Sequence, residues 1–214
     1  RVTETACLLK TILGEKPLLF TIRTDREGGE VSVDFSEYEN ILMEVAGSGG
    51  VDLIDVEMFR GYDNCSVRPD SFKAEDSCNK SVRKMVQNLN TMVTVIGSYH
   101  DFDKTPSLEE ISARLVFMKE LGADIPKIAV MPKSREDVMT LMRATLLTRE
   151  VLKEVPLITM SMGGLGAVSR VAGESFGSDV TFGCVGKSSA PGQIEVKELK
   201  HMLELLHCAD ESSI

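Results

Sequence analysis

Lys127 interrupts an apolar run, Ile125–Met131, whose length and Ile/Val content are typical of a buried β-strand. Alternation along a strand places Lys127 on the same face as Ala129, among small or apolar side chains. Lysine is rarely buried in proteins, and burial favours the neutral amine, which is the form that attacks a carbonyl group. A lysine that reaches past a strand end or pairs with a carboxylate is the structural alternative. The position therefore predicts either a nucleophilic amine or a structural lysine.

Further polar side chains stand where predicted strands end. His100 closes the strand-like run before the one that holds Lys127, where it could be an acid–base group or a structural histidine bonded to the backbone. Arg23 ends an earlier run, with Glu27 in the turn after it, and Arg170 follows a later run. Each arginine could form a salt bridge at the end of its strand. Together with the lysine, the two arginines would also supply the local positive charge that an anionic substrate needs.

No pattern in the sequence predicts a metal site. Asp55 and Glu57 stand in one strand-like run, but two carboxylates without clustered His or Cys are too few ligands for zinc or magnesium. The five cysteines are odd in number and irregularly spaced, and they form no C-x-x-C pair. This usage fits free thiols in a reducing compartment, so we expect a cytoplasmic protein.

The composition excludes two classes of partner. The 214 residues are 43% apolar and 27% charged, as in an ordinary soluble globular protein. The net charge of −9 argues against nucleic acid as the main partner, because a phosphate backbone requires a basic face. No apolar run approaches the roughly 20 residues that cross a bilayer, so no membrane span is predicted. The first residues lack the apolar stretch of a secretory signal, so we expect them to belong to a helix and not to a targeting segment.

Short apolar runs alternate with longer stretches of helical apolar spacing, which predicts an α/β fold with a parallel sheet. The repeat is close to thirty residues, the unit of a (β/α)₈ TIM barrel of about 250 residues. A Rossmann fold is a weaker alternative, since no G-x-G-x-x-G follows the first run. About six βα units are visible, so the barrel is expected to be incomplete. The six predicted strands are residues 18–24, 51–59, 93–100, 125–132, 157–163 and 180–185.

Local signals mark two helix starts and one irregular repeat. Ser107 with Glu110, and Ser134 with Asp137, have the spacing of capping boxes. Residues 60–86 make one repeat longer than its neighbours, and we expect a surface loop or a helix extension there.

Several long motifs in a fixed order together resemble the type I 3-dehydroquinate dehydratases of the shikimate pathway. The resemblance covers nearly the whole chain except residues 60–90, and it implies a (β/α)₈ barrel. The matching stretches are residues 17–30, 98–106, 122–132, 158–162, 169–174, 176–178 and 189–193.

The resemblance implies a reaction and the residues that catalyse it. Lys127 would be the Schiff-base lysine, His100 the general acid–base group, and Glu27 the carboxylate that orients His100 by a hydrogen bond. The reaction would be the syn elimination of water from 3-dehydroquinate to 3-dehydroshikimate, a carbon–oxygen lyase activity. A cationic imine on the lysine acts as the electron sink, so no cofactor or metal is implied.

The substrate would be held by a second set of residues. Arg170, aided by Gln193 and Ser189, would bind the substrate carboxylate, and Arg23 would contact the ring hydroxyls. Met162 and Phe182 would form the pocket wall. The segment Lys187–Gln193 would close over the bound substrate and exclude water.

Two alternatives and several wider expectations accompany this interpretation. A class I aldolase or other Schiff-base lyase also uses a barrel lysine, and a non-catalytic homologue could keep the pocket without turnover. The resemblance further implies a homodimer. The chain begins in what resembles the helix after the second barrel strand, so we expect a single domain over residues 1–214 that lacks two N-terminal strands. Little or no turnover, and a missing barrel neighbour for residues 18–24 or 180–185, would follow.

Overall fold

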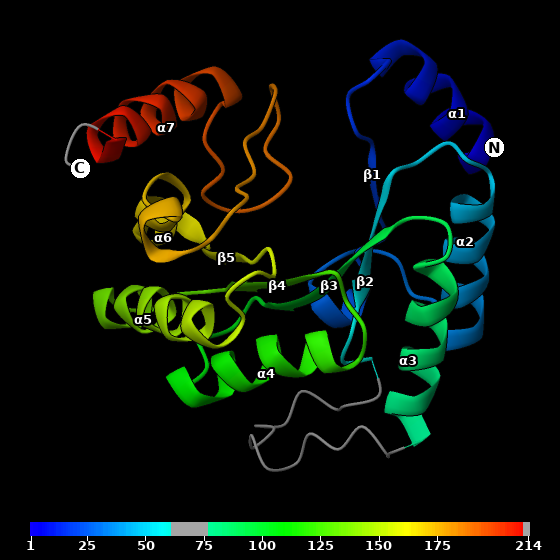
Figure 1. The fold of residues 1–214 in the computed structure, drawn as a ribbon, viewed down its shortest axis with the longest axis horizontal. Coiled ribbons are helices and arrows are strands. Elements are labelled where there is room, and N and C mark those ends of the chain that lie inside the picture. The colour runs from blue at the N-terminus through cyan, green and yellow to red at the C-terminus, as the bar shows by residue number, and fades with distance from the viewer. Residues whose placement is uncertain (61–76, 212–214) are drawn as a thin grey trace. The chain divides into compact units, whose positions relative to one another are not determined.

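The computed structural model describes residues 1–60 and 77–211. They form an α/β structure whose five strands lie in the order β1-β2-β3-β4-β5 (Figure 1), with β2 parallel to both β1 and β3. The strands are β1 (Leu19–Thr21), β2 (Leu53–Glu57), β3 (Thr94–Asp101), β4 (Ile125–Val130) and β5 (Ile158–Ser161).

Helices connect the strands in the order expected of a (β/α) barrel, because each strand neighbours the next one along the chain. The helices are α1 (Val2–Leu13), α2 (Phe35–Gly47), α3 (Ser77–Leu89), α4 (Leu108–Glu120), α5 (Arg135–Val151), α6 (Gly163–Val171) and α7 (Val196–Glu211), with the short 3-10 helices η1 (Asp25–Glu27) and η3 (Glu174–Phe176). The predicted α/β class is confirmed. Most of the loop or helix extension expected at 60–86, together with Cys65, lies outside the described residues.

The sixth predicted strand, residues 180–185, is wrong. This segment forms only an isolated bridge between Cys184 and Glu195. The backbone N–H of Cys184 donates to the carbonyl of Ile194, and its own carbonyl accepts from the N–H of Val196, at 2.9 Å each. The backbone groups of Cys184 are therefore bonded to the chain just before α7 instead of to a neighbouring strand.

The chain divides into two compact units. The first comprises residues 1–99 and 114–127, and the second residues 100–113 and 128–214. The expected single domain over 1–214 stays a prediction.

The first unit is organised around β2 and its covering helices. Ile54 and Val56 in β2 are fully buried, as are Tyr38 and Leu42 in α2. The side chain of Asp34 accepts a hydrogen bond from the N–H of Glu37 at 2.8 Å, which fixes the start of α2. Helix α2 packs against α1 and α3. The Tyr38 hydroxyl in α2 accepts a hydrogen bond from the N–H of Glu57, which links this helix to the carboxyl end of β2.

In the second unit, α5 packs on β5 and on α6. The predicted capping box at Ser134 and Asp137 is confirmed, with both reciprocal hydrogen bonds present at the start of α5. The Ser107 hydroxyl also accepts from the N–H of Glu110 at 3.2 Å, at the start of α4. Thr145 in α5 and Thr159 in β5 share a buried 2.7 Å hydrogen bond.

Candidate active site

Lys127 lies in β4 with its side chain only 9% exposed, and its Nζ donates a 2.7 Å hydrogen bond to Oδ2 of Asp55 in β2. The Asp55 side chain is 0% exposed. The buried position predicted for the lysine is thus observed, and so is the carboxylate partner named as the structural alternative. An ion pair and a nucleophilic role of the same lysine can coexist.

Arg23, just after β1, donates hydrogen bonds to three carboxylates of the first unit, one of which belongs to the predicted site residue Glu27. Its Nη2 donates to Oδ1 of Asp55 at 2.8 Å, and its Nη1 donates to Glu27 at 3.0 Å and to Glu57 at 3.1 Å. Burial by itself would lower the pKa of Arg23, but the three carboxylates together raise that pKa above its ordinary value. The guanidinium therefore remains charged, and through Asp55 it is linked to Lys127.

Glu57, at the end of β2, is the second buried carboxylate of the cluster. Its Oε2 accepts from the hydroxyl of Thr24 at 2.6 Å and from Nη1 of Arg60 at 3.0 Å, and its Oε1 accepts from the N–H of Thr24 at 2.8 Å. The backbone N–H of Glu57 donates to the Tyr38 hydroxyl at 3.0 Å, and burial raises the pKa of that hydroxyl well above its usual range. Glu57 thus anchors the turn after β1 to the end of β2.

The ion pairs of this region define one group, which we call the β1–β4 charge cluster. It contains three carboxylates and three cations, so its formal charges balance. A balanced cluster can be buried because every charge has a partner of opposite sign. Its members are Arg23, Glu27, Asp55, Glu57, Arg60 and Lys127.

Arg170 is the buried cation of the second unit. It lies in α6 and is 1% exposed. Its Nη2 donates to the carbonyl of Pro191 at 3.1 Å, and its Nη1 lies 3.4 Å from Sδ of Met160 and 3.5 Å from the carbonyl of Phe182. Within residues 1–60 and 77–211, no carboxylate pairs with it, and its Nε has no hydrogen-bond partner. Burial lowers the pKa of Arg170.

The segment Lys187–Gln193 folds onto itself and onto the start of α6. Oε1 of Gln193 accepts from the N–H of Ser189 at 2.8 Å and from its hydroxyl at 3.1 Å. The carbonyl of Pro191 accepts from the N–H of Gly163 as well as from Arg170. A Cβ at Gly192 would lie 2.3 Å from the carbonyl oxygen of Gly163, and the φ of Gly192 is +75°, so only glycine fits this approach.

The remaining predicted site residues fall in the second unit. His100 is the penultimate residue of β3 and is partly exposed. Met162 is buried at the N-terminus of α6, where its N–H donates to the carbonyl of Val130 at 2.8 Å. Phe182 is half-buried. The structure thus brings Arg23, Glu27 and Lys127 into one cluster, and it places Arg170 beside the segment that holds Ser189 and Gln193.

Sequence reasoning missed the importance of Asp55 and Glu57, which were weighed only as metal ligands. The signal was present, because two carboxylates two positions apart lie on one face of a strand whose other residues from Leu53 to Phe59 are apolar. Buried carboxylates require cationic partners, so such a pair should have been matched with Arg23 and Lys127.

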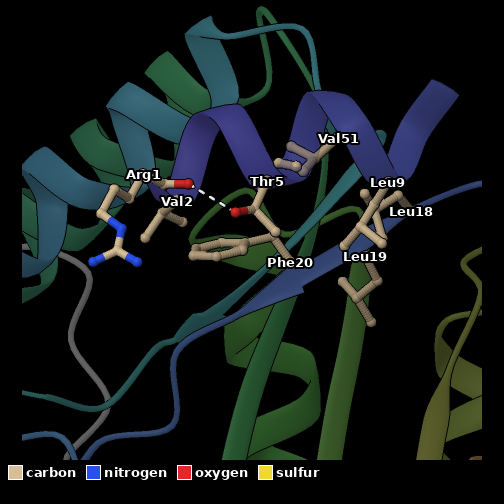
Figure 2. A pocket seen from close by; sticks show the side chains of 9 residues that line it. Arg1, Val2, Thr5, Leu9, Leu18, Leu19, Phe20 and Val51 are labelled. Atoms are coloured by element: carbon tan, nitrogen blue, oxygen red, sulfur yellow. Dashed lines mark hydrogen bonds between the residues drawn. The ribbon is translucent and has the colours of Figure 1, made fainter.

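A pocket in the first unit contains none of the predicted site residues. It has a volume of about 350 Å³. Figure 2 shows its wall of apolar side chains from α1, from the start of β1 and from Val51, with the hydroxyl of Thr5 bonded to the carbonyl of Arg1. Its polar lining residues are Arg1 and Thr5, and neither belongs to the charge cluster.

Three absences concern the described residues alone. They contain no group of three His, Cys, Asp or Glu side chains placed to hold a metal ion. Cys7, Cys184 and Cys208 are free thiols. None of the helices in residues 1–60 and 77–211 is long and apolar enough to span a membrane.

Comparison with known proteins gives consistent matches over almost the whole chain. A family model described as Type I 3-dehydroquinase matches residues 1–210. A 3-dehydroquinate dehydratase of Listeria monocytogenes is 48% identical over 199 residues, which are 93% of this chain and 72% of the relative. That of Salmonella typhimurium is 46% identical over 208 residues, covering 97% and 76% of the two chains.

A solved structure shows the same likeness in three dimensions. The type I 3-dehydroquinate dehydratase of Clostridium difficile, crystallised with covalently modified comenic acid, has a TM-score of 0.85 and 43% identity. The alignment covers 97% of this chain and 76% of that one. The predicted barrel class of the fold is confirmed by this match.

Proposed function

Because the chain belongs to the type I 3-dehydroquinase family, whose members are carbon–oxygen lyases that dehydrate 3-dehydroquinate, we propose that Lys127 forms an imine with this substrate and His100 moves the protons. The observation that carries the proposal is the buried position of Lys127 in the β1–β4 charge cluster, and the family resemblance implies the role of imine-forming lysine for it.

The imine explains why the reaction needs a lysine. The neutral amine of Lys127 attacks the ketone carbon, one proton is taken up, the carbonyl oxygen leaves as water with that proton and one from the nitrogen, and a cationic imine remains. This cation draws electrons from the neighbouring carbon, which makes the proton on that carbon far more acidic. The Clostridium difficile relative was crystallised with covalently modified comenic acid, so covalent chemistry is found in a relative's structure. A lysine imine is the form of that chemistry proposed for this chain.

His100 takes the acidified proton and then donates one to the hydroxyl that departs one carbon further on. A syn elimination places both transfers on one side of the ring, so one imidazole can serve as base and then as acid. General acid–base catalysis of this type contributes about 10²–10⁴ in rate. Glu27 is proposed to hold the His100 ring in the productive orientation. The imine is finally hydrolysed, which releases 3-dehydroshikimate and regenerates the amine.

The carboxylate of the substrate is proposed to bind Arg170, with Gln193 and Ser189 as additional donors. Arg170 suits this role because it is a buried cation without a carboxylate partner among the described residues, so an anion would supply the missing charge. Ser189 and Gln193 lie in the segment that contacts Arg170 through Pro191.

Three further residues complete the proposed binding site. Arg23 is proposed to contact the ring hydroxyls of the substrate. Met162 and Phe182 are proposed to form the apolar wall of the pocket, and residues 187–193 to act as the lid. A lid of this kind would exclude water while the imine exists.

The direct test is reduction of the imine in the intact protein. Borohydride added with 3-dehydroquinate should leave a covalent adduct that peptide mass spectrometry locates on Lys127. Lys104 and Lys133 are exposed lysines that precede and follow Lys127 in the sequence, and they serve as internal controls. An adduct on either of them in place of Lys127 would contradict the assignment. Lys127→Ala should trap no adduct and lose nearly all turnover.

Assembly and location are proposed from the family resemblance. We propose a homodimer in the cytoplasm. Light scattering after size-exclusion chromatography should give twice the chain mass, and a monomer at micromolar concentration would contradict the dimer. Fractionation of the source cells tests the location.

A further inference from the structure

We propose that Asp55 is the counter-ion of the cationic imine on Lys127. The inference rests on the proposed function, because it requires Lys127 to form that imine. It gives Asp55 a direct role in the reaction, since its carboxylate touches the nitrogen atom that reacts.

The two oxygens of Asp55 have different partners. Oδ1 accepts from the Ser98 hydroxyl at 2.6 Å and from Nη2 of Arg23 at 2.8 Å. Oδ2 accepts from Nζ of Lys127 at 2.7 Å. Two donors on the first oxygen fix the plane of the carboxylate, and this plane directs the second oxygen at the reactive nitrogen. The 0% exposure of Asp55 keeps bulk water from replacing these contacts.

The charge on the lysine nitrogen is the same at the two ends of imine formation. An ammonium and a ketone give an iminium and water, in which the nitrogen loses two protons, the departing oxygen gains both, and a carbon–nitrogen bond replaces the carbon–oxygen bond. The iminium nitrogen keeps one N–H and the positive charge. A carboxylate placed for the ammonium of Lys127 is therefore also placed for the iminium, and Asp55 needs no rearrangement.

An iminium on Lys127 would need a carboxylate as its partner. The side chain of Lys127 is nearly buried, and an unpaired cation in such a site is strongly disfavoured. The other two carboxylates of the charge cluster accept hydrogen bonds from other residues. Glu57 accepts from Thr24 and Arg60, and Glu27 accepts from Arg23. A fixed carboxylate in a site of low polarity stabilises a nearby cation more than water would.

Replacing the carboxylate of Asp55 by an amide should destabilise the iminium, because the amide removes the opposite charge beside it. Asp55→Asn keeps the size and the acceptor oxygen of the side chain while removing the charge. Asp55→Glu keeps the charge and changes the size. The two variants therefore separate charge from packing.

The experiment traps the iminium with cyanoborohydride, which reduces protonated imines, and follows the adduct on Lys127 by mass spectrometry with 3-dehydroquinate as the ketone. Asp55→Asn should slow adduct formation roughly tenfold or more. Asp55→Glu should trap faster than Asp55→Asn. If Asp55 served packing alone, the near-isosteric Asn would be the milder change, so faster trapping in Asp55→Asn than in Asp55→Glu would overturn the proposal.

The matched control is the substitution Asp52→Asn, in the same part of the chain as Asp55. Asp52, just before β2, also pairs with a lysine at 2.7 Å, but this pair with Lys10 is partly exposed. Asp52→Asn should trap the imine at the wild-type rate. Circular dichroism shows which variants fold. Should Asp55→Asn not fold, Asp55→Glu decides by itself, because a folded Asp55→Glu protein that traps no adduct would overturn the counter-ion role.

Wild type and Asp55→Asn together separate the two proposals. Absence of an adduct on Lys127 in the wild-type protein would contradict the proposed function itself. An adduct in wild type that forms equally fast in Asp55→Asn would reject the role of Asp55 and leave the imine at Lys127 standing.

Discussion

The guanidinium of Arg170 donates a hydrogen bond to the carbonyl oxygen of Pro191 at 3.1 Å, so the buried cation of the second unit is joined to the segment 187–193. A carbonyl oxygen carries only a partial charge, and it offsets part of the free energy needed to bury a full positive charge. The position of Arg170 is thus better suited to an incoming anion than to the stability of the unliganded fold.

Replacing Arg170 with Met should therefore separate stability from substrate binding. We expect the free energy of unfolding to stay within about 1 kcal/mol of wild type or to rise, because an apolar side chain removes a buried charge that no carboxylate neutralises. The KM for 3-dehydroquinate should rise by roughly a hundredfold or more, as for a lost buried charge pair. Urea unfolding and steady-state kinetics measure the two effects. A loss of several kcal/mol without a change in KM would show that Arg170 is purely structural.

Replacing His100 with Ala tests the division of roles between the two proposed catalysts. Turnover should fall by about 10²–10⁴, the usual contribution of a general acid–base group. The protein should still trap an adduct on Lys127, because imine formation depends mainly on the amine. Single-turnover trapping and steady-state rates are compared on the same preparation. Near-normal turnover in the folded variant would remove His100 from the mechanism.

Glu57 should matter most for stability, because it joins the turn after β1 to Arg60. Glu57→Gln leaves the charges of Arg23 and Arg60 with one carboxylate fewer, and we expect a loss of about 3–5 kcal/mol in the free energy of unfolding. The control is Glu204→Gln, which breaks the exposed pair with Lys200 and should change stability little. Equal effects of the two substitutions would contradict the importance of burial in the charge cluster.

The pair of Asp52 with Lys10 predicts a small dependence of stability on pH. The hydrogen bond from Lys10 holds the pKa of Asp52 below its ordinary value of 3.8. A depressed pKa in the folded state stabilises the fold above that ordinary value, and the contribution is lost as the pH falls through the lower, folded value. Since Asp52 is 37% exposed, solvent screening limits the contribution to below about 1 kcal/mol.

The measurement compares wild type with Asp52→Asn in urea at several pH values. The difference in unfolding free energy should be largest at neutral pH and should shrink below pH 4. A difference that grows on acidification would give the opposite sign and would contradict the assignment of the shift to Asp52.

The periodicity of the sequence was sufficient to predict five strands and two helix starts, because buried strands and capping boxes leave local signals. It was not sufficient at residues 180–185. Their composition is that of a strand, but Cys184 is bonded to Ile194 and Val196, and this long-range pairing leaves no local trace. Similarly, the burial of Lys127 followed from its own strand, whereas its contact with Asp55 joins residues 72 positions apart.

The close approach of Gly192 to Gly163 limits how the sequence of this region can vary. The three atoms nearest to a Cβ at position 192 are all backbone atoms of Gly163, so no rotation of a side chain could relieve the clash. Gly163 itself has a φ of +68°. The two glycines are thus constrained as a pair, although they lie 29 positions apart in the chain. In a saturation mutagenesis library selected for growth, position 192 should accept no other amino acid, whereas the exposed Lys187 should accept most of them.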